Sequence, residues 1–174
     1  MTSTLNIAPL DRNNIPELAR LINSAYRGES SKKGWTTEAD LLGGMRTNET
    51  YLNELLQKPG ATILTAKDAK GQLAGCVYLQ QETNHIYLGM LTVAPDKQAR
   101  GIGSQLLQAA ENYAIDLEYG SIIMTVIDVR FELIEWYKRK GYQSTGDTKP
   151  FPTDPDFGIP KQPLQFIVLK KNMQ

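Results

Sequence analysis

The segment Val93-Ala-Pro-Asp-Lys-Gln-Ala-Arg-Gly-Ile-Gly-Ser-Gln-Leu-Leu107 decides the fold. It has the pattern of a strand end, a tight turn, a glycine-containing loop and the first turn of a helix. Gly101 and Gly103 stand where the loop becomes the helix, so unpaired backbone N–H groups and the positive end of the helix dipole meet there. Arg100 and Gln98 add side-chain donors beside them. The segment therefore predicts a binding site for a ligand that carries phosphates.

The sequence on both sides of this loop is apolar. Residues 86–93 have the composition of a buried strand, and they follow two strand-like segments, 61–66 and 73–81, that a polar hairpin connection joins. These three segments predict an antiparallel meander. After the loop, apolar residues recur at helical spacing to about Glu118, at Ile102, Leu106, Ala109, Ala110, Tyr113, Ala114 and Leu117.

The remaining elements are predicted from hydrophobic periodicity and from the glycine and proline residues that end helices and strands. Five prolines between 150 and 163 predict a loop or surface flap, because proline is excluded from helix interiors and central strands. No low-complexity linker interrupts the chain, so we expect one domain over residues 1–174. The other expected elements are a strand at 2–10, a helix at 15–26, a short helix ended by Gly43 and Gly44, a helix at 48–57, a buried strand at 121–127, a helix at 130–140 ended by Gly141, a strand beginning at 142–145 and a closing strand at 164–171.

Composition limits the classes of partner. The 174 residues include 19 Lys plus Arg and 19 Asp plus Glu, a balance that favours neither nucleic acid nor an anionic membrane as the partner. The single cysteine, Cys76, cannot form an internal disulfide, and one His with one Cys provides no zinc-ligand spacing, so we expect no metal. No signal peptide or membrane-spanning segment is recognisable, and a reducing, cytoplasmic setting is expected.

Three kinds of phosphate-binding loop can be compared with the segment. A Walker A loop needs Gly-Lys-Ser/Thr after its glycines, but Gly103 is followed by Ser104 and Gln105. A dinucleotide fingerprint needs a third glycine at position 106, which is Leu106, and a βαβ unit in place of a meander. The third pattern is Gln/Arg-x-x-Gly-x-Gly/Ala, which this chain has as Gln98-Ala-Arg-Gly-Ile-Gly103.

With this motif, the order of elements and the segment Trp136-Tyr-Lys-Arg-Lys-Gly-Tyr142, the chain resembles the GNAT superfamily of acyl-CoA-dependent N-acetyltransferases. The resemblance covers almost the whole chain. It implies an α+β GNAT-like acyl-CoA N-acyltransferase fold, with a mixed, mostly antiparallel twisted sheet of about seven strands flanked by about four or five helices. It also implies acetyl-CoA as cosubstrate, a direct transfer to a primary amine, and a homodimer as a common state of the family.

The resemblance implies a cofactor cleft formed by the strand before the loop. In the family this strand bulges and splays from its neighbour, and the pantetheine arm lies in the wedge. Carried over, the backbone of Leu91 and Val93 would bind the arm. The pyrophosphate would lie against the backbone N–H groups of Gln98, Ala99, Arg100, Gly101, Ile102, Gly103 and Ser104, where small residues allow close approach.

Tyr137 is the candidate catalytic residue. It lies where the family often has a tyrosine that faces the thioester sulfur, and a phenol there can protonate the departing thiolate. The alternative is that Tyr137 belongs to the core, since its helix is rich in apolar residues. Arg130 shares its helix face with Ile134 and Tyr137, at a position where the family commonly has an asparagine. Arg130 either contacts the cofactor or pairs with Glu132 or Asp128 as a surface ion.

The general base and the acceptor site have weaker signals. Histone-type members have a glutamate where this chain has Tyr87, and a phenol is a poor base at neutral pH. Glu82 and His85 are alternatives, or the amine arrives neutral and needs no base. The resemblance implies an acceptor pocket between residues 26–35 and the proline-rich segment, with candidate substrate-binding residues Glu29, Trp35, Tyr87, Phe151 and Phe157, and with Asp154 and Asp156 as further carboxylates; Cys76 is expected in the core.

These inferences predict an N-acetyltransferase that moves the acetyl group of acetyl-CoA to a primary amine, a small molecule rather than a histone-type lysine. The alternative is a non-catalytic acyl-CoA-binding or sensing domain. Tyr137 and the loop favour the enzyme, whereas Tyr87 in place of the glutamate keeps the alternative open. The sequence does not identify the amine.

Overall fold

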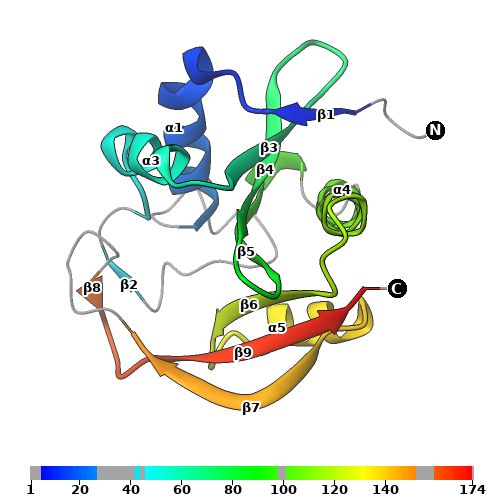
Figure 1. The fold of residues 1–174 in the computed structure, drawn as a ribbon. Helices are drawn as coiled ribbons and strands as arrows, with labels where there is room; N and C mark the ends of the chain where they lie inside the picture. The colour runs from blue at the N-terminus through cyan, green and yellow to red at the C-terminus, as the bar shows by residue number, and fades with distance from the viewer. Residues whose placement is uncertain (1–4, 27–41, 44–45, 98–100, 152–158, 174) are drawn as a thin grey trace.

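The computed structural model describes residues 5–26, 42–43, 46–97, 101–151 and 159–173 (Figure 1). Within these ranges, no helix has the length and apolar character that crossing a bilayer requires. The elements in chain order are β1 (Asn6–Pro9), a 3-10 turn η1 (Arg12–Asn14), α1 (Ile15–Tyr26), β2 (Leu42–Gly43), α3 (Glu49–Gln57), β3 (Ala61–Lys67), β4 (Leu73–Gln81), β5 (Ile86–Val93), a 3-10 turn η2 (Pro95–Lys97), α4 (Ile102–Asp116), β6 (Ser121–Ile127), α5 (Phe131–Arg139), β7 (Gln143–Pro150), β8 (Ile159–Pro160) and β9 (Gln165–Asn172).

A seven-stranded sheet in the order β1-β3-β4-β5-β6-β9-β7 forms the centre of the fold. All its neighbouring pairs are antiparallel except β5 with β6. The α+β fold with a mixed, mostly antiparallel sheet is therefore confirmed, as is the β3-β4-β5 meander. Figure 1 shows α1 and α3 on one side of this meander and α4 on the other.

Helices α1 and α3 cover one face of the meander. The apolar residues of α1 recur at helical spacing, so Leu18 and Ile22 are fully buried on one stripe. Asn48 caps α3, because its side chain accepts a hydrogen bond from the N–H of Tyr51 at 2.7 Å. Both helices pack on side chains of β3, β4 and β5, which include Ile63, Cys76 and Met90. The first core thus lies between α1, α3 and the meander.

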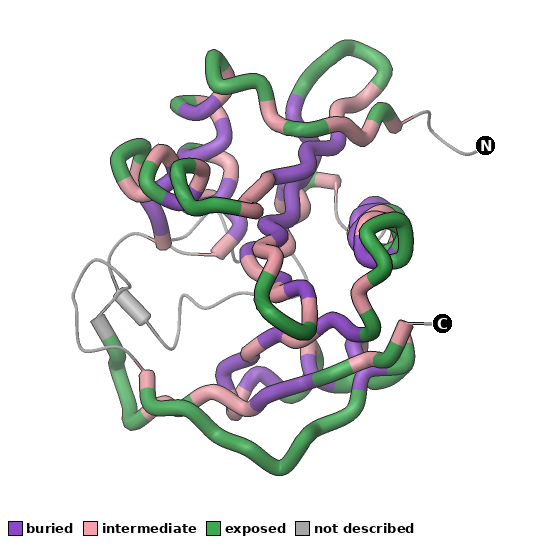
Figure 2. The backbone as a smooth tube through the Cα atoms, viewed as in Figure 1, coloured by how far each residue is buried: buried purple, intermediate pink, exposed green. Residues whose placement is uncertain are grey.

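Helices α4 and α5 cover the opposite face. Leu106 and Ala110 of α4 are fully buried, and they pack in one cluster with Val77 of β4 and with Ile134 and Tyr137 of α5. Figure 2 shows the buried backbone concentrated in the central strands and on the inner sides of the helices, whereas β7 at the sheet edge is exposed along its length. These two cores hold β5 rigidly between two helical layers.

The sheet opens between β5 and β6. Their parallel pairing comprises only Ile86 with Ile122 and Tyr87 with Ile123, so the two strands separate beyond Tyr87. On its other side, β5 carries a bulge, because Met90 and Leu91 together lie opposite the single residue Val77. Met90 takes a φ of +50°, a left-handed conformation that is rare for a residue with a side chain. The bulge and the splay that the family resemblance implied are both present.

Three sequence predictions need correction. The segment before Gly43 was expected to be the end of a short helix, but Leu42–Gly43 forms the two-residue strand β2, which pairs with β8 inside the proline-rich segment. The proline-rich segment 150–163 is therefore not only a loop, because β7 extends to Pro150 and β8 lies within the segment. Proline lacks an N–H but can stand at a sheet edge or strand end, which is where Pro150 and Pro160 occur. Helix α4 ends at Asp116, two residues earlier than predicted, and Glu118 turns the chain with a φ of +62°.

Gly75 of β4 permits the close packing of β4, β5 and α4. A Cβ atom at this position would lie 2.5 Å from the carbonyl oxygen of Thr92 and 2.9 Å from Cδ1 of Leu106. Gly75→Ala should therefore lower the free energy of unfolding by about 1–3 kcal/mol, because the backbone of β5 would have to move. Urea denaturation measures this loss. Gly120→Ala is the matched control, since nothing lies within 4 Å of a Cβ atom there; equal stabilities of the two variants would contradict the packing argument.

Candidate active site

A cleft opens where β5 and β6 separate. It has a volume of about 220 Å³ and receives residues from α1, β5, the start of α4 and α5. Its walls combine backbone from β5 and α4 with aromatic and aliphatic side chains from α5. The lining residues are Ala25, Tyr26, Leu91, Thr92, Val93, Gly101, Ile102, Gly103, Ser104, Arg130, Leu133, Trp136 and Tyr137.

The N-terminus of α4 forms one end of the cleft. Gly101 is the N-cap residue, with a φ of +79° in the left-handed region that glycine adopts without strain. Since glycine has no side chain, it does not occupy the first N–H groups of the helix as Asn48 does in α3. These N–H groups and the helix dipole therefore favour an anion at this end of the cleft.

Gly103 provides a test of whether this end of the cleft fits a pyrophosphate. A Cβ atom on Gly103 would make only ordinary contacts, 3.5 Å from Cγ2 of Val93 and 3.6 Å from Trp136. The protein's own packing therefore does not require glycine here. A ligand whose phosphate oxygens approach the backbone closely would require it, so the residues that are present fit a CoA pyrophosphate.

Tyr137 lies in the cleft wall and also in the core. It is 5% exposed and packs edge-on against Trp136 and Tyr142, with ring centres 5.1 and 5.9 Å away. Burial raises the pKa of its phenol above the ordinary value, and the nearby Tyr26 adds to the shift while Arg130 opposes it. The phenol therefore keeps its proton over the whole neutral range. The two sequence-based interpretations of Tyr137, core residue and cleft residue, are compatible in the structure.

The burial of Arg130 excludes one of the two interpretations that the sequence left open for this residue. It is only 4% exposed, so the interpretation as an ordinary surface ion is wrong. Its guanidinium carbon lies 5.7 Å from the centre of the Tyr26 ring, a cation–π contact, and its side chain lines the cleft beside Leu133 and Tyr137. Arg130 is thus a buried cation at the cleft wall.

Leu91 and Val93 both line the cleft from β5. The carbonyl of Leu91 accepts a hydrogen bond from the hydroxyl of Tyr26 at 2.5 Å, which ties the end of α1 to the bulged strand. A carbonyl oxygen has two lone pairs, so this bond leaves acceptor capacity for a ligand.

The neighbouring Cys76 is fully buried on β4, and burial raises the pKa of its thiol to about 12, which makes it unsuited to nucleophilic attack. Its expected place in the core is confirmed.

A second cavity of about 250 Å³ adjoins the cleft. The two share five lining residues, Tyr26, Leu91, Arg130, Leu133 and Tyr137. The second cavity continues past these residues to Tyr87, whose hydroxyl lies 3.5 Å from Oγ1 of Thr125, and to Phe151, which packs on Phe166 at 5.3 Å between ring centres. Tyr137 and Arg130 therefore stand at the junction of two connected spaces.

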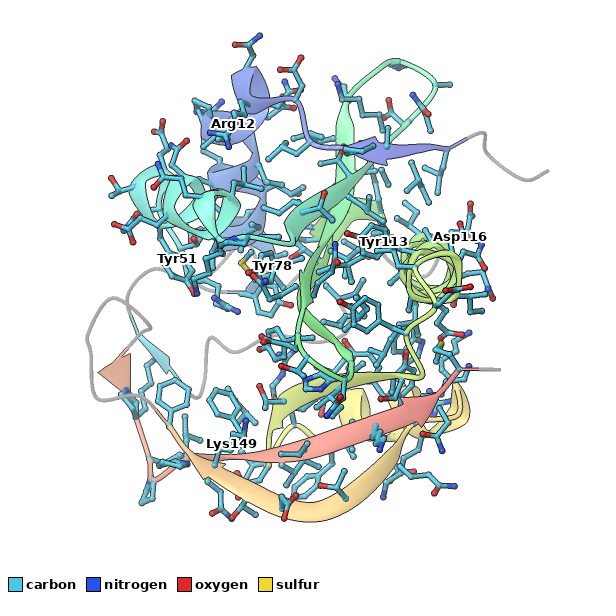
Figure 3. All side chains as sticks on the ribbon, in the orientation of Figure 1. Arg12, Tyr51, Tyr78, Tyr113, Asp116 and Lys149 are labelled. Atoms are coloured by element: carbon cyan, nitrogen blue, oxygen red, sulfur yellow. The ribbon has the colours of Figure 1, made fainter. Side chains whose placement is uncertain are left out.

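A third cavity of about 260 Å³ shares Arg46, Tyr51, Tyr87, Gly89 and Met90 with the second. Tyr51 of α3 and Tyr78 of β4 line it together, and Figure 3 shows them side by side between α3 and the meander. Burial raises the pKa of Tyr78 to about 12 and raises that of Tyr51 as well, so both phenols are neutral donors and acceptors near neutral pH. The second and third cavities are thus lined by several tyrosines.

The structure brings most of the described candidate residues together. Leu91, Val93, Gly101, Ile102, Gly103, Ser104, Arg130 and Tyr137 line the cleft, and Tyr87 and Phe151 line the second cavity. The predictions for Gln98, Ala99, Arg100, Glu29, Trp35, Phe157, Asp154 and Asp156 lie outside the described residues. Of the alternative bases, Glu82 lines the third cavity, whereas His85 lines none of the three. Among the described residues, no three His, Cys, Asp or Glu side chains gather as a metal site would require.

Several residues that line the cleft or the second cavity were not predicted from the sequence as site residues, namely Arg46, Tyr51, Leu133 and Trp136. A signal existed for the last two, because Leu133 and Trp136 share a helix face with Arg130 and Tyr137 at spacings of three and four residues. No local pattern marks Arg46 or Tyr51. Both reach the site through the packing of α3 against α1.

A cleft at a splayed strand, ending at a helix N-terminus that glycine caps, is the arrangement that the resemblance to the GNAT N-acetyltransferases implied. The model of the acetyltransferase (GNAT) family matches residues 16–142. The chain therefore belongs to this family, and the resemblance found in the sequence is confirmed.

Curated relatives match shorter segments. The mycothiol acetyltransferase of Clavibacter sepedonicus is 30% identical over 83 residues, which are 48% of this chain and 27% of that protein. Its counterpart in Clavibacter michiganensis subsp. michiganensis is 47% identical over 49 residues, 28% of this chain and 16% of that protein. The chain thus spans about a quarter or less of the length of these relatives.

Solved structures match over nearly the whole chain. The ribosomal-protein-S18-alanine N-acetyltransferase of Escherichia coli superimposes with a TM-score of 0.72 at 14% identity, covering 98% of this chain and 95% of that one. The protein smu.2055 of Streptococcus mutans UA159 gives a TM-score of 0.73 at 16% identity, with 97% and 99% covered. At such identities the likeness establishes the fold alone.

Proposed function

We propose that this protein is an N-acetyltransferase that moves the acetyl group of acetyl-CoA to a primary amine by direct attack. One observation supports the proposal above all others. The N-terminus of α4, which favours an anion, and the buried phenol of Tyr137 line one and the same cleft at the β5–β6 separation. When bound, acetyl-CoA supplies an activated thioester carbonyl at this place.

The chain's own residues divide into holding groups and reacting groups. The N–H groups from Gly101 to Ser104 hold the pyrophosphate, and the backbone of Leu91 and Val93 holds the pantetheine arm. Gln98, Ala99 and Arg100 belong to the same proposed phosphate loop by sequence. Such fixed donors orient the donor substrate toward the junction with the second cavity.

Tyr137 is the proposed general acid. Its phenol stays protonated because burial raises its pKa, so it can donate a proton to the departing thiolate at neutral pH. Arg130, at the same junction, disfavours a second positive charge nearby. An amine that arrives there has a lowered pKa and loses its proton more readily, which reduces the need for a dedicated base.

The pH profile should show this arrangement. We expect kcat/KM to rise with pH as the amine deprotonates and then to stay level up to about pH 10, because the raised pKa of Tyr137 keeps the acid protonated beyond the ordinary tyrosine value. Initial rates of coenzyme A release measure the profile, after subtraction of the amine-free rate that reflects thioester hydrolysis. A decline that begins below pH 9 would assign the acid to another group.

A non-catalytic acyl-CoA-binding or sensing domain is the second candidate, favoured by Tyr87 in place of an acidic base. Coenzyme A release across a panel of primary amines separates the two functions. We expect release with at least one amine and a matching product one acetyl group heavier in the mass spectrum. Tight binding of acetyl-CoA without release for any amine would support the sensing domain. A cytoplasmic location, a homodimer and a small-molecule acceptor stay predictions from the sequence.

A further inference from the structure

The second cavity is positively charged among its described lining residues. The second cavity is lined by two arginines, Arg46 and Arg130, and none of its described lining residues is Asp or Glu. Both guanidinium carbons lie against the ring of Tyr26, at 5.4 and 5.7 Å from its centre. A cavity of this charge repels an acceptor that carries only ammonium groups and attracts one that also carries an anion.

Arg46 is held in place by α1. The side-chain oxygen of Asn23 accepts hydrogen bonds from the backbone N–H groups of Arg46 at 2.7 Å and Thr47 at 3.0 Å. The Asn23 amide nitrogen donates in turn to the carbonyl of Thr47 at 2.9 Å. Three bonds from the partly buried side chain of Asn23 thus fix the backbone from which Arg46 projects. A preorganised cation loses less entropy when it binds a ligand than one on a freely moving segment.

The contacts of the Arg46 side chain leave the in-plane N–H donors of its guanidinium available to a ligand. Within the described residues its guanidinium forms no ion pair and packs on the ring of Tyr26. A guanidinium that packs on a ring uses its flat face, while its N–H donors lie in the plane and match a carboxylate with two parallel bonds. Arg46 also lines both the second and the third cavity, so it lies farther from the cleft than Arg130 does.

We propose that the acceptor is a small amine that carries a carboxylate, of the amino-acid class, and that Arg46 binds this carboxylate. The inference rests on the proposed acetyl transfer and names its substrate class. The amine nitrogen reaches the junction at Arg130 and Tyr137, while the carboxylate binds Arg46 across the ring of Tyr26. The tyrosines around the second and third cavities provide neutral hydrogen-bond partners for the rest of the acceptor.

The test compares each free acid with its carboxamide. Coenzyme A release is measured with glycine, with the L- and D-forms of the eighteen chiral proteinogenic amino acids that have a primary amine, with β-alanine and γ-aminobutyrate, each against its carboxamide, and with spermidine. The amine nitrogen keeps its position within each pair while the carboxylate charge is lost, and rates are compared at equal concentrations of the neutral amine, because the α-amine of a carboxamide has the lower pKa. We expect the best free acid to exceed its amide in kcat/KM by about 10- to 100-fold, the range of one charge-assisted hydrogen-bond pair.

Arg46→Gln should remove that preference by raising KM for the acid while KM for acetyl-CoA stays unchanged. Arg46→Lys should restore part of it, because the charge remains but the paired donors do not. Arg12→Gln is the matched control, since Arg12 is exposed in η1, before the start of α1, and lies away from Tyr51 and Tyr78 in Figure 3. It should leave all constants unchanged.

The outcomes separate this inference from the proposed function. The inference is contradicted if spermidine or the amides are turned over at least as well as the free acids. It is also contradicted if Arg46→Gln keeps the preference for acids. Both results leave acetyl transfer intact. If no amine is turned over, the proposed function fails, and calorimetric titration of the same acids into protein saturated with coenzyme A decides the inference. If the protein binds free acids more tightly than their amides and Arg46→Gln abolishes this difference, the carboxylate site is supported. Equal binding of acids and amides overturns it.

Discussion

Tyr137→Phe should lower kcat for acetyl transfer by about 100- to 1,000-fold, the contribution typical of a positioned general acid. The substitution removes one hydroxyl and keeps the ring, which packs between Trp136 and Tyr142. KM for acetyl-CoA should stay nearly unchanged, because the proposed holding groups lie on β5 and α4. A loss in kcat without a loss in binding is expected of a group that acts only in the transition state.

Initial rates of coenzyme A release and the melting temperature of each variant test this prediction. Tyr113→Phe is the matched control, because its hydroxyl bonds to Gln81 at 3.3 Å and Tyr113 does not line any of the three cavities described above. It should retain full activity. A kcat of Tyr137→Phe within threefold of the unsubstituted protein would return Tyr137 to a purely structural role.

Gly103→Glu should abolish binding of acetyl-CoA. The side chain would enter the cleft at the α4 N-terminus and place a carboxylate against the pyrophosphate. Because a ligand that binds the folded state raises its melting temperature, the rise with acetyl-CoA should disappear. Without ligand the fold should persist, since a Cβ atom on Gly103 meets its neighbours only at ordinary contact distances.

Two further variants sharpen this experiment. Gly103→Ala should weaken binding less than the glutamate does, and alanine at a helical position should keep or raise the melting temperature of the free protein. Gly120→Glu adds the same charge at a position with open space and should bind acetyl-CoA normally. A melting-temperature rise that survives in Gly103→Glu would move the phosphate site away from α4.

The residues that line the cleft from α4 and α5 could be predicted, because their signals are local. Gly101 and Gly103 follow the end of β5 in the chain, and the face of α5 that includes Arg130 and Tyr137 repeats at helical spacing. Backbone N–H groups at a helix start need only the right residues nearby in sequence. The bulge at Met90 has no comparable local signal, and it was expected only from the family resemblance.

The places of Arg46 and Tyr51 at the second cavity could not be predicted, because they depend on packing between distant segments. Arg46 reaches the Tyr26 ring only because Asn23 on α1 binds the backbone before α3. The burial of Arg130 is another example, since the sequence left open whether it contacts the cofactor or pairs as a surface ion, whereas the ring of Tyr26 from α1 lies against it. Such contacts between segments far apart in the sequence leave no period or motif to detect.

A crystal structure with acetyl-CoA bound tests the central claim most directly. We expect the pyrophosphate at the backbone N–H groups of Gly101–Ser104, the pantetheine arm along Leu91 and Val93 between β5 and β6, and the thioester sulfur within hydrogen-bonding distance of the Tyr137 hydroxyl. A pyrophosphate bound elsewhere, or a thioester separated from Tyr137 by the width of another side chain, would contradict both the binding site and the assignment of the acid.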